Sequence, residues 1–234
     1  MSDVLFAKSR PAIKHFSSGL NFYMLFWAFF LGNILGVTIE VVYGILVNHR
    51  VESHVGLIYG PFNLVYGIGA LAMTWLEYRL RKNPVVIILL AGMMIGGIVE
   101  IFCSFVQERI FGSVSWDYAE LPMNYGGRTH FKATILWGVL SVIWIKWLYP
   151  FMIRWIAKIP DALGKAVTWI LLVFIVIDSV MSGLAVLRWS ARLREEPPQT
   201  PLDTYFDTYF PDDKMAVIYY NMVFIEKDKD RDLD

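Results

Sequence analysis

Two glutamates in otherwise apolar stretches are the residues of this sequence best suited to binding a positive charge. Glu40 ends the segment GNILGVTIE, residues 32–40, and Glu100 ends GMMIGGIVE, residues 92–100. A charged carboxylate at the centre of a bilayer costs about 2.5–3.5 kcal/mol on insertion scales, so such residues are rare without a partner or a function. We expect the pair to bind a cation, a proton or a basic group of a substrate. The alternative is that each glutamate is protonated or hydrogen-bonded and holds helices together, which is the role we expect for Asp178.

Both segments share the pattern Gly-x-x-x-Gly-x-x-x-Glu, and its glycines must position the glutamates. Residues four and eight positions apart share one face of a helix, so each glutamate lies on the face of its glycines. Two glycines four residues apart let a second backbone approach closely, which is how helices pack in lipid. If the two halves face each other, the carboxylates converge. The expected helix-packing residues are Gly32, Gly36, Gly92 and Gly96.

Two polar stretches supply the other candidate binding residues. YGPFN (59–63) precedes one apolar run and SWDYAELPMNYGGR (115–128) precedes another. Arg128 could pair with Asp117, or it could reach toward the two glutamates and keep them ionised. The aromatic residues of the longer stretch are also typical of a membrane interface. From the two stretches we include Asn63, Asp117, Asn124 and Arg128 in the predicted substrate- or ion-binding site.

The composition is that of a protein that crosses a membrane several times. Of 234 residues, 56% are hydrophobic, 16% aromatic and only 18% charged. Because one crossing needs about 20 apolar residues, we predict an all-α polytopic membrane helix bundle of about five transmembrane helices. The first two resemble the next two, which indicates a parallel 2+2 repeat of the kind found in transporter cores; the alternative is chance. The predicted spans are residues 20–47, 58–78, 84–106, 133–153 and 166–188.

The second span begins irregularly. Proline lacks an N–H and restricts the residue before it, so we expect a regular helix only after Pro61. Val65 to Leu80 then leaves about 16 residues, which is short for a full crossing. Irregular backbone at membrane depth must be buried in protein or line a cavity. The alternative is an ordinary proline in the first turn of a helix.

The chain divides into three predicted regions: a basic N-terminal segment (1–19), a transmembrane domain (20–190) and an acidic, aromatic C-terminal tail (191–234). We expect the Pro-rich and charged flanks of the tail to be flexible and its aromatic middle to act as a tether or to dock. Basic residues favour an inner N-terminus, although an odd number of helices would place Arg188, Arg192 and Arg194 outside. The basic residues expected inside are Lys8, Arg10, Lys14, Arg79, Arg81, Lys82, Arg154, Lys158 and Lys165.

Several kinds of chemistry lack their sequence signatures. Cys103 is the single cysteine, and the chain has neither a P-loop, nor a nucleophile elbow, nor a zinc-protease motif. The two histidines beside Glu52 fit no standard zinc spacing, and no basic patch suggests nucleic acid. We therefore predict no catalytic residues, no metal site, no cofactor and no nucleic-acid partner. ATP hydrolysis, if coupled, would need a separate ATPase subunit.

Three separated motifs resemble the bacterial membrane family described as Putative ABC-transporter type IV, or CmpB-like. They are Tyr59-Gly60-Pro61-Phe62-Asn63, then Trp116-Asp117-Tyr118 with Pro122-Met123-Asn124, Gly127-Arg128 and Trp137-Gly138, and finally a stretch from Asp207 to Met222. The chain departs from the family pattern at Ala119, Met123 and Thr129, so we expect the local packing beside Asn124 and Arg128 to differ from that of the family. The resemblance implies a multi-spanning permease-type membrane protein without settled substrate, and it supplies no catalytic residues.

The sequence thus predicts a permease-like transporter subunit for a small solute or ion, located in the bacterial plasma membrane. Its partners would be the lipid bilayer, with a separate ATPase and further copies of the chain left open. One alternative is a membrane-embedded protein or enzyme that binds a lipid head group through Asp117, Asn124 and Arg128. The other is a non-catalytic membrane scaffold that acts through its acidic tail.

Overall fold

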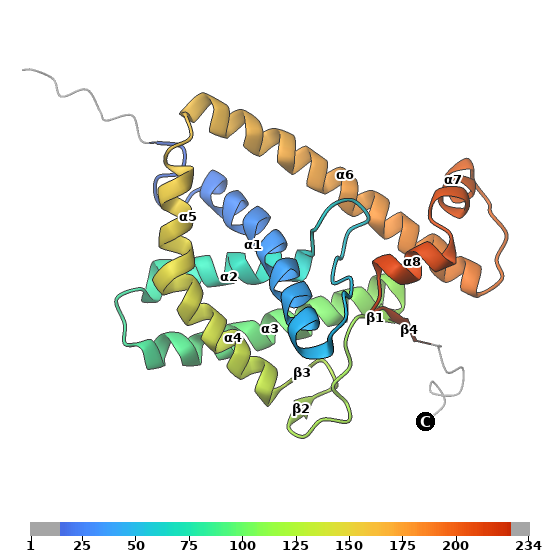
Figure 1. The fold of residues 1–234 in the computed structure, drawn as a ribbon, viewed down its shortest axis with the longest axis horizontal. Coiled ribbons are helices and arrows are strands. Elements are labelled where there is room, and N and C mark those ends of the chain that lie inside the picture. The colour runs from blue at the N-terminus through green and yellow to red at the C-terminus, as the bar shows by residue number, and fades with distance from the viewer. Residues whose placement is uncertain (1–14, 226–234) are drawn as a thin grey trace, which may run out of the picture.

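The computed structural model describes residues 15–225. The basic residues Lys8, Arg10 and Lys14, and the end of the tail, 226–234, lie outside the described residues. The described chain is helical apart from four two-residue strands (Figure 1). In chain order the helices are α1 (Phe22–Tyr43) with a π-turn at Gly44–Asn48, α2 (Leu64–Leu80), α3 (Val85–Phe111), α4 (Phe131–Ile143) with a π-turn at Trp144–Leu148, α5 (Tyr149–Ile156), α6 (Asp161–Leu193), α7 (Pro201–Tyr209) and α8 (Asp212–Ile218).

Four helical segments of the described chain are long and apolar enough to cross a membrane, which confirms the predicted polytopic helical bundle. They are Phe22–Val47, Val85–Phe111, Phe131–Ile156 and Asp161–Leu193. The second predicted span, 58–78, is not among these four; it corresponds to α2, which has 17 residues and begins three residues after Pro61. Asn63 caps its first turn, accepting a hydrogen bond from the Val65 amide at 3.1 Å.

Helix ends follow local chemistry. Pro84 and Pro160 precede α3 and α6, where the missing N–H of a proline leaves no helical hydrogen bond unmade. Gly112 ends α3 in the left-handed region, at φ 63°, which glycine adopts without a Cβ clash. Pro150 lies at the start of α5, directly after the π-turn that links it to α4. A proline cannot donate a helical hydrogen bond. Here it coincides with the π-turn, where the α-helical hydrogen-bond pattern is already interrupted.

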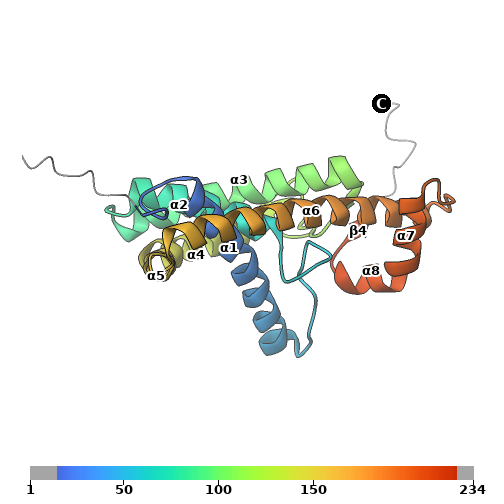
Figure 2. The same cartoon turned by 90° about the horizontal axis from the view of Figure 1, so that it is seen from above.

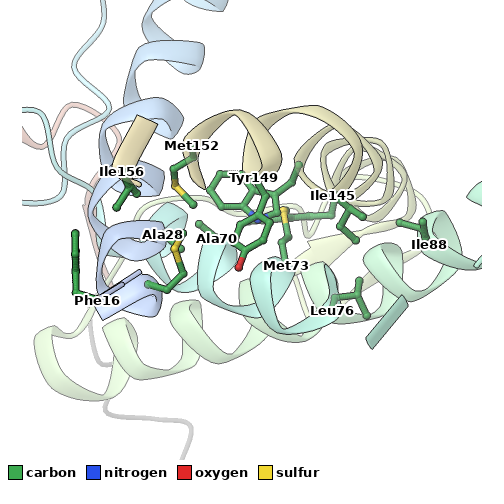
Figure 3. Close-up of a cluster of buried hydrophobic side chains, with 13 residues drawn as sticks. Phe16, Ala28, Ala70, Met73, Leu76, Ile88, Ile145, Tyr149, Met152 and Ile156 are labelled. Atoms are coloured by element: carbon green, nitrogen blue, oxygen red, sulfur yellow. The ribbon is translucent and has the colours of Figure 1, made fainter. Parts of the chain in front are cut away.

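The bundle is assembled from helix pairs. Helix α1 packs mainly on α2, and α3 mainly on α4, with α2 and α3 in contact between the pairs. A hydrophobic core joins the helix pairs (Figure 3). Helices α1, α2 and α3 contribute to it, and so does the continuous rod formed by α4 and α5, Phe131–Ile156. Within it the Trp144 indole of the rod donates to the Thr74 hydroxyl of α2 at 3.1 Å. The labelled core residues are Phe16, Ala28, Ala70, Met73, Leu76, Ile88, Ile145, Tyr149, Met152 and Ile156.

Long loops close one end of the bundle. The loop between α3 and α4 contains β1 (Ser113–Val114) and a small hairpin of β2 (Asn124–Tyr125) and β3 (Thr129–His130). Strand β1 pairs with β4 (Val223–Phe224) near the end of the described chain. The β1–β4 pairing therefore connects the tail to this loop.

The aromatic middle of the C-terminal tail is docked on α6, which is one of the two roles expected for it. Helices α7 and α8 lie at the far end of α6 from α5 (Figures 1 and 2). Arg188 of α6, only 6% exposed, donates from Nε and Nη2 to both carboxylate oxygens of Asp207 at 2.8 Å. Arg192 adds bonds to Asp207 at 2.8 Å and Asp212 at 2.6 Å. The buried cluster between tail and α6 comprises Ala185, Val186, Trp189, Phe206, Phe210, Met215 and Tyr219.

Candidate functional site

The glycines of the repeated pattern lie where the paired helices approach most closely. A Cβ at Gly32 would be 2.3 Å from the Ala70 Cβ, and one at Gly36 would be 2.1 Å from the Tyr66 ring. Such distances are far below van der Waals contact, so only glycine permits this packing of α1 on α2.

The second pair is built in the same way. A Cβ at Gly92 would be 2.3 Å from the Ser141 Oγ, and one at Gly96 would be 2.2 Å from the Trp137 Cβ. In each pair the second glycine of the pattern lies against an aromatic side chain of the partner helix. The first glycine lies against a small residue four positions after that aromatic residue. Each glutamate follows its second glycine by four residues, so it is placed beside that aromatic residue.

Both glutamates line one cavity of about 310 Å³. Glu40 is half-buried, and the hydroxyl of Tyr66 is close enough to interact with it. Glu100 is 8% exposed and accepts a hydrogen bond from the Thr129 hydroxyl of β3. Trp137 also interacts with Glu100 through its indole N–H. The two acids thus line the same cavity, and a shared binding site formed by them stays a prediction.

Tyr118 reports the electrostatic field of this cavity from the α3–α4 loop. Burial raises the pKa of its hydroxyl, and the negative charges of Glu100 and Glu40 raise it further. Tyr118 therefore lies close enough to interact electrostatically with both Glu40 and Glu100. Two carboxyl groups on the wall of one cavity make that cavity suited to a positively charged ligand.

The polar loop residues predicted for the site are engaged in holding the loops together. Asp117 is exposed and accepts from the Ala119 amide at 2.8 Å. Asn124 donates to the carbonyls of Ala119 and Leu121 at 3.0 and 2.8 Å and accepts from the Gly127 amide. Asn63 donates to the His54 carbonyl at 2.9 Å in addition to capping α2. These three are not among the residues lining the Glu40 cavity, and a binding role for them stays a prediction.

The sequence suggested Asp117 or the two cavity glutamates as partners of Arg128, and the structure shows neither pairing. Its guanidinium forms an ion pair with Glu108 and donates to the Ser104 hydroxyl at 3.0 Å. Both partners lie on α3, one turn apart, so the residue fastens the hairpin to that helix. Glu108 was missed in the sequence, although a carboxylate near the end of the helix preceding an arginine-bearing loop is a recognisable signal.

Comparison with known proteins places the chain in a family. The family described as Putative ABC-transporter type IV matches residues 27–183, well over half of the sequence. The chain belongs to this family. No curated protein and no solved structure gives a significant match.

The Putative ABC-transporter type IV match covers α1 to most of α6 and therefore both glutamates, the cavity and the two loops. It confirms the resemblance found in the motifs of residues 59–63 and 116–138. The stretch from Asp207 to Met222 lies beyond the matched residues. Membership thus covers the helical core and supports the assignment to a membrane transporter family.

The aromatic lining of the cavity is the feature that the sequence did not reveal. Trp116, Tyr118 and Trp137 belong to the motifs that carry the family resemblance, whereas Tyr66 and Trp144 give no distinct signal in the sequence, and nothing in the sequence places any of the five beside the glutamates. Aromatic residues are frequent throughout this chain, at 16%, so only the packing of α2 against α4 selects which of them surround the glutamates.

A second cavity of about 280 Å³ adjoins the first. It lies among the loop before α2, the outer parts of α3 and α6, and the end of the described tail. Five side chains with hydrogen-bonding groups line both cavities: His54, Tyr66, Ser115, Trp116 and Asn221.

Asp178 of α6 bonds to the backbone before α2 through one carboxylate oxygen, and the structural role expected for it stays a prediction. It is 1% exposed and accepts from the Tyr59 amide at 3.3 Å and the Ser182 hydroxyl at 3.2 Å. Ser182 in turn accepts from the Ile58 amide at 2.8 Å. The acid and the serine thereby fix the irregular backbone before α2 to α6.

Proposed function

We propose that this protein is the membrane-spanning, permease-like subunit of a transporter in the bacterial plasma membrane, and that a small positively charged solute or ion binds between Glu40 and Glu100. The observation that carries the proposal is the shared cavity, in which two intramembrane acids from matching helix pairs meet. Intramembrane carboxylates that face a cavity commonly mark substrate or ion pathways, and sites at the interface of repeated helix pairs are typical of transporters.

The second cavity adjoins the first, which supports a pathway for the solute rather than an isolated binding pocket. The two cavities share several lining side chains, and rotation of a side chain is far faster than movement of a helix. Asn221 and His54 contact each other at 3.3 Å between the Asn221 Nδ2 and the His54 Nδ1. A solute leaving the glutamates could therefore pass beneath the loops that close the bundle. An ATPase, as the family description suggests, would be a separate polypeptide.

The head-group alternative receives less support from the geometry. It relies on Asp117, Asn124 and Arg128, whose polar groups are occupied by the internal bonds described above. A head-group phosphate would have to displace Glu108 from Arg128. Glu40 and Glu100 also accept internal hydrogen bonds, but only from neutral groups.

The test is binding and uptake of cations by the full chain with Glu40→Gln and Glu100→Gln. Each change keeps side-chain size and removes the charge, so each should abolish saturable cation binding while the protein remains inserted and folded. Glu120→Gln is the matched control, because Glu120 is exposed and outside the cavity. Unchanged binding and uptake in both cavity variants would exclude the proposed site.

A further inference from the structure

We infer that the cavity binds an organic ammonium group carried by a small amphipathic amine, rather than a bare metal ion. This inference rests on the proposed function and adds the class of substrate. The supporting features are the aromatic walls of the cavity, its charge, its size and its rim.

Five aromatic residues line the cavity together with the glutamates: Tyr66, Trp116, Tyr118, Trp137 and Trp144. The face of an aromatic ring attracts ammonium groups, with a gain of about 0.5–2 kcal/mol per contact and a preference for organic cations in aromatic cages. The indole N–H groups of Trp116 and Trp144 are already bonded, to the Arg128 carbonyl at 2.9 Å and to the Thr74 hydroxyl at 3.1 Å. These two rings therefore offer the cavity their carbon surfaces rather than a donor that would repel a cation.

The ligand set is poorly suited to a metal ion. Among residues 15–225 no group of three or more His, Cys, Asp and Glu side chains could hold one. Calcium takes six to eight oxygen ligands and zinc usually four ligands of defined geometry. A space of about 310 Å³ is far larger than such an ion needs and lies at the lower end of small-molecule sites, about 300–1,000 Å³.

The charge of the lining argues against an anionic or zwitterionic solute. Apart from tyrosines, its ionisable residues are Glu40, Glu100 and His54. No lysine or arginine is available to bind a phosphate or carboxylate group. A plain amine or quaternary ammonium compound brings a positive charge to the acids and carries no negative group that the lining would have to pair.

The rim of the cavity accounts for an apolar part of the ligand. Leu35 and Ile39 of α1 are 37% and 49% exposed, and Leu136 of α4 is 58% exposed, while all three line the cavity. In a bilayer these exposed apolar side chains contact lipid. The cavity thus borders the hydrocarbon between α1 and α4, where the alkyl or aryl part of an amphipathic amine would be favourably placed.

The experiment compares choline with its neutral isostere 3,3-dimethylbutan-1-ol, and with sodium and calcium ions, by calorimetry on the purified full chain. We expect saturable choline binding, no binding of the isostere, and tighter binding of benzyltrimethylammonium because its ring contacts the apolar rim. Tyr118→Leu and, as a second ring deletion, Trp116→Leu should each weaken choline binding about tenfold, which is about 1.4 kcal/mol. Tyr118→Phe keeps the ring and should bind like the parent.

The outcomes separate this inference from the proposed function. Glu40- and Glu100-dependent binding of sodium or calcium without binding of ammonium compounds would overturn the organic-ammonium class and leave the cation site standing. Full choline binding in folded Tyr118→Leu and Trp116→Leu proteins would overturn the aromatic contribution. If no cation of either kind binds, or if binding survives both glutamate changes, both proposals fail.

Discussion

The Trp137 side chain of α4 lies against Gly96 of α3, so closely that a methyl group at Gly96 would be 2.2 Å from the Trp137 Cβ. The far edge of the same ring lies beside Gly69 of α2, where an added Cβ would be 2.7 Å away. One aromatic residue of the second helix pair thereby fills the space left by glycines on two other helices. This contact sets the distance between the pairs, and hence the position of Glu100.

Gly96→Ala should therefore destabilise the bundle. The atoms that the new methyl group meets are the Cβ and Cγ of Trp137, which cannot rotate away, so α3 and α4 must separate. Overpacking of this kind costs about 1–3 kcal/mol. Thermal unfolding in detergent measures the loss. Gly183→Ala is the control: its Cβ would meet the Phe111 ring at an ordinary 3.5 Å, and equal destabilisation of both variants would refute the close-packing argument.

Thr129→Val should weaken cation binding without altering the fold. The Thr129 hydroxyl, on a residue only 5% exposed, is a hydrogen-bond donor to the Glu100 carboxylate. Hydrogen bonds to charged groups contribute about 1.5–3 kcal/mol, so at least a tenfold loss of affinity is expected by calorimetry. Thr134→Val, whose hydroxyl bonds only to the Phe131 carbonyl of its own helix, should leave the affinity as it is.

Arg128 and Glu108 should show energetic coupling in a double-mutant cycle. Arg128→Ala and Glu108→Ala each release the hairpin from α3, and because they remove the same ion pair, the double variant should lose less than the sum. Both side chains are partly exposed, 24% and 37%, so we expect a coupling of about 1 kcal/mol. Urea or thermal unfolding supplies the four free energies. Strict additivity would contradict the pairing.

Asp207→Asn should loosen the tail from α6. Arg188 is buried and directs two donors at Asp207, so the change leaves a buried charge incompletely paired at a cost of about 2 kcal/mol or more. Faster proteolysis of residues 195–225 would show the release. The control is Glu196→Gln, which removes an exposed ion pair. Its tail should be cleaved no faster than the tail of the parent protein.

The stabilisation by Asp207 should depend on pH in one direction. The hydrogen bonds of Arg188, followed by those of Arg192, lower the pKa of this carboxyl group. A group whose pKa is lowered in the folded state stabilises it fully above the unfolded pKa, about 3.9, and loses that contribution as the pH falls through the lowered value. The stability difference between the parent and Asp207→Asn should be constant near neutral pH and shrink below about pH 4. A difference that grew on acidification would have the wrong sign.

Much of the helical framework could be predicted because it depends on local sequence. Apolar runs of sufficient length indicated the bundle, and Pro61 indicated that α2 would start late and be short. The tail was harder, because its Pro-rich and acidic composition suggests flexibility. The folded tail depends on Asp207 and Asp212 meeting two arginines of α6, and charge pairs between separate segments leave no periodic signal.

The sequence by itself determined that Glu40 and Glu100 share helix faces with their glycines, since a helix repeats every 3.6 residues and that spacing is local. Only the tertiary structure decided that both acids border one cavity, that Arg128 binds Glu108 instead of reaching them, and that particular tyrosines and tryptophans surround them. Those facts depend on the angles and separations at which helices pack. These are set by close contacts such as that of Trp137 with Gly96, between residues far apart in the chain.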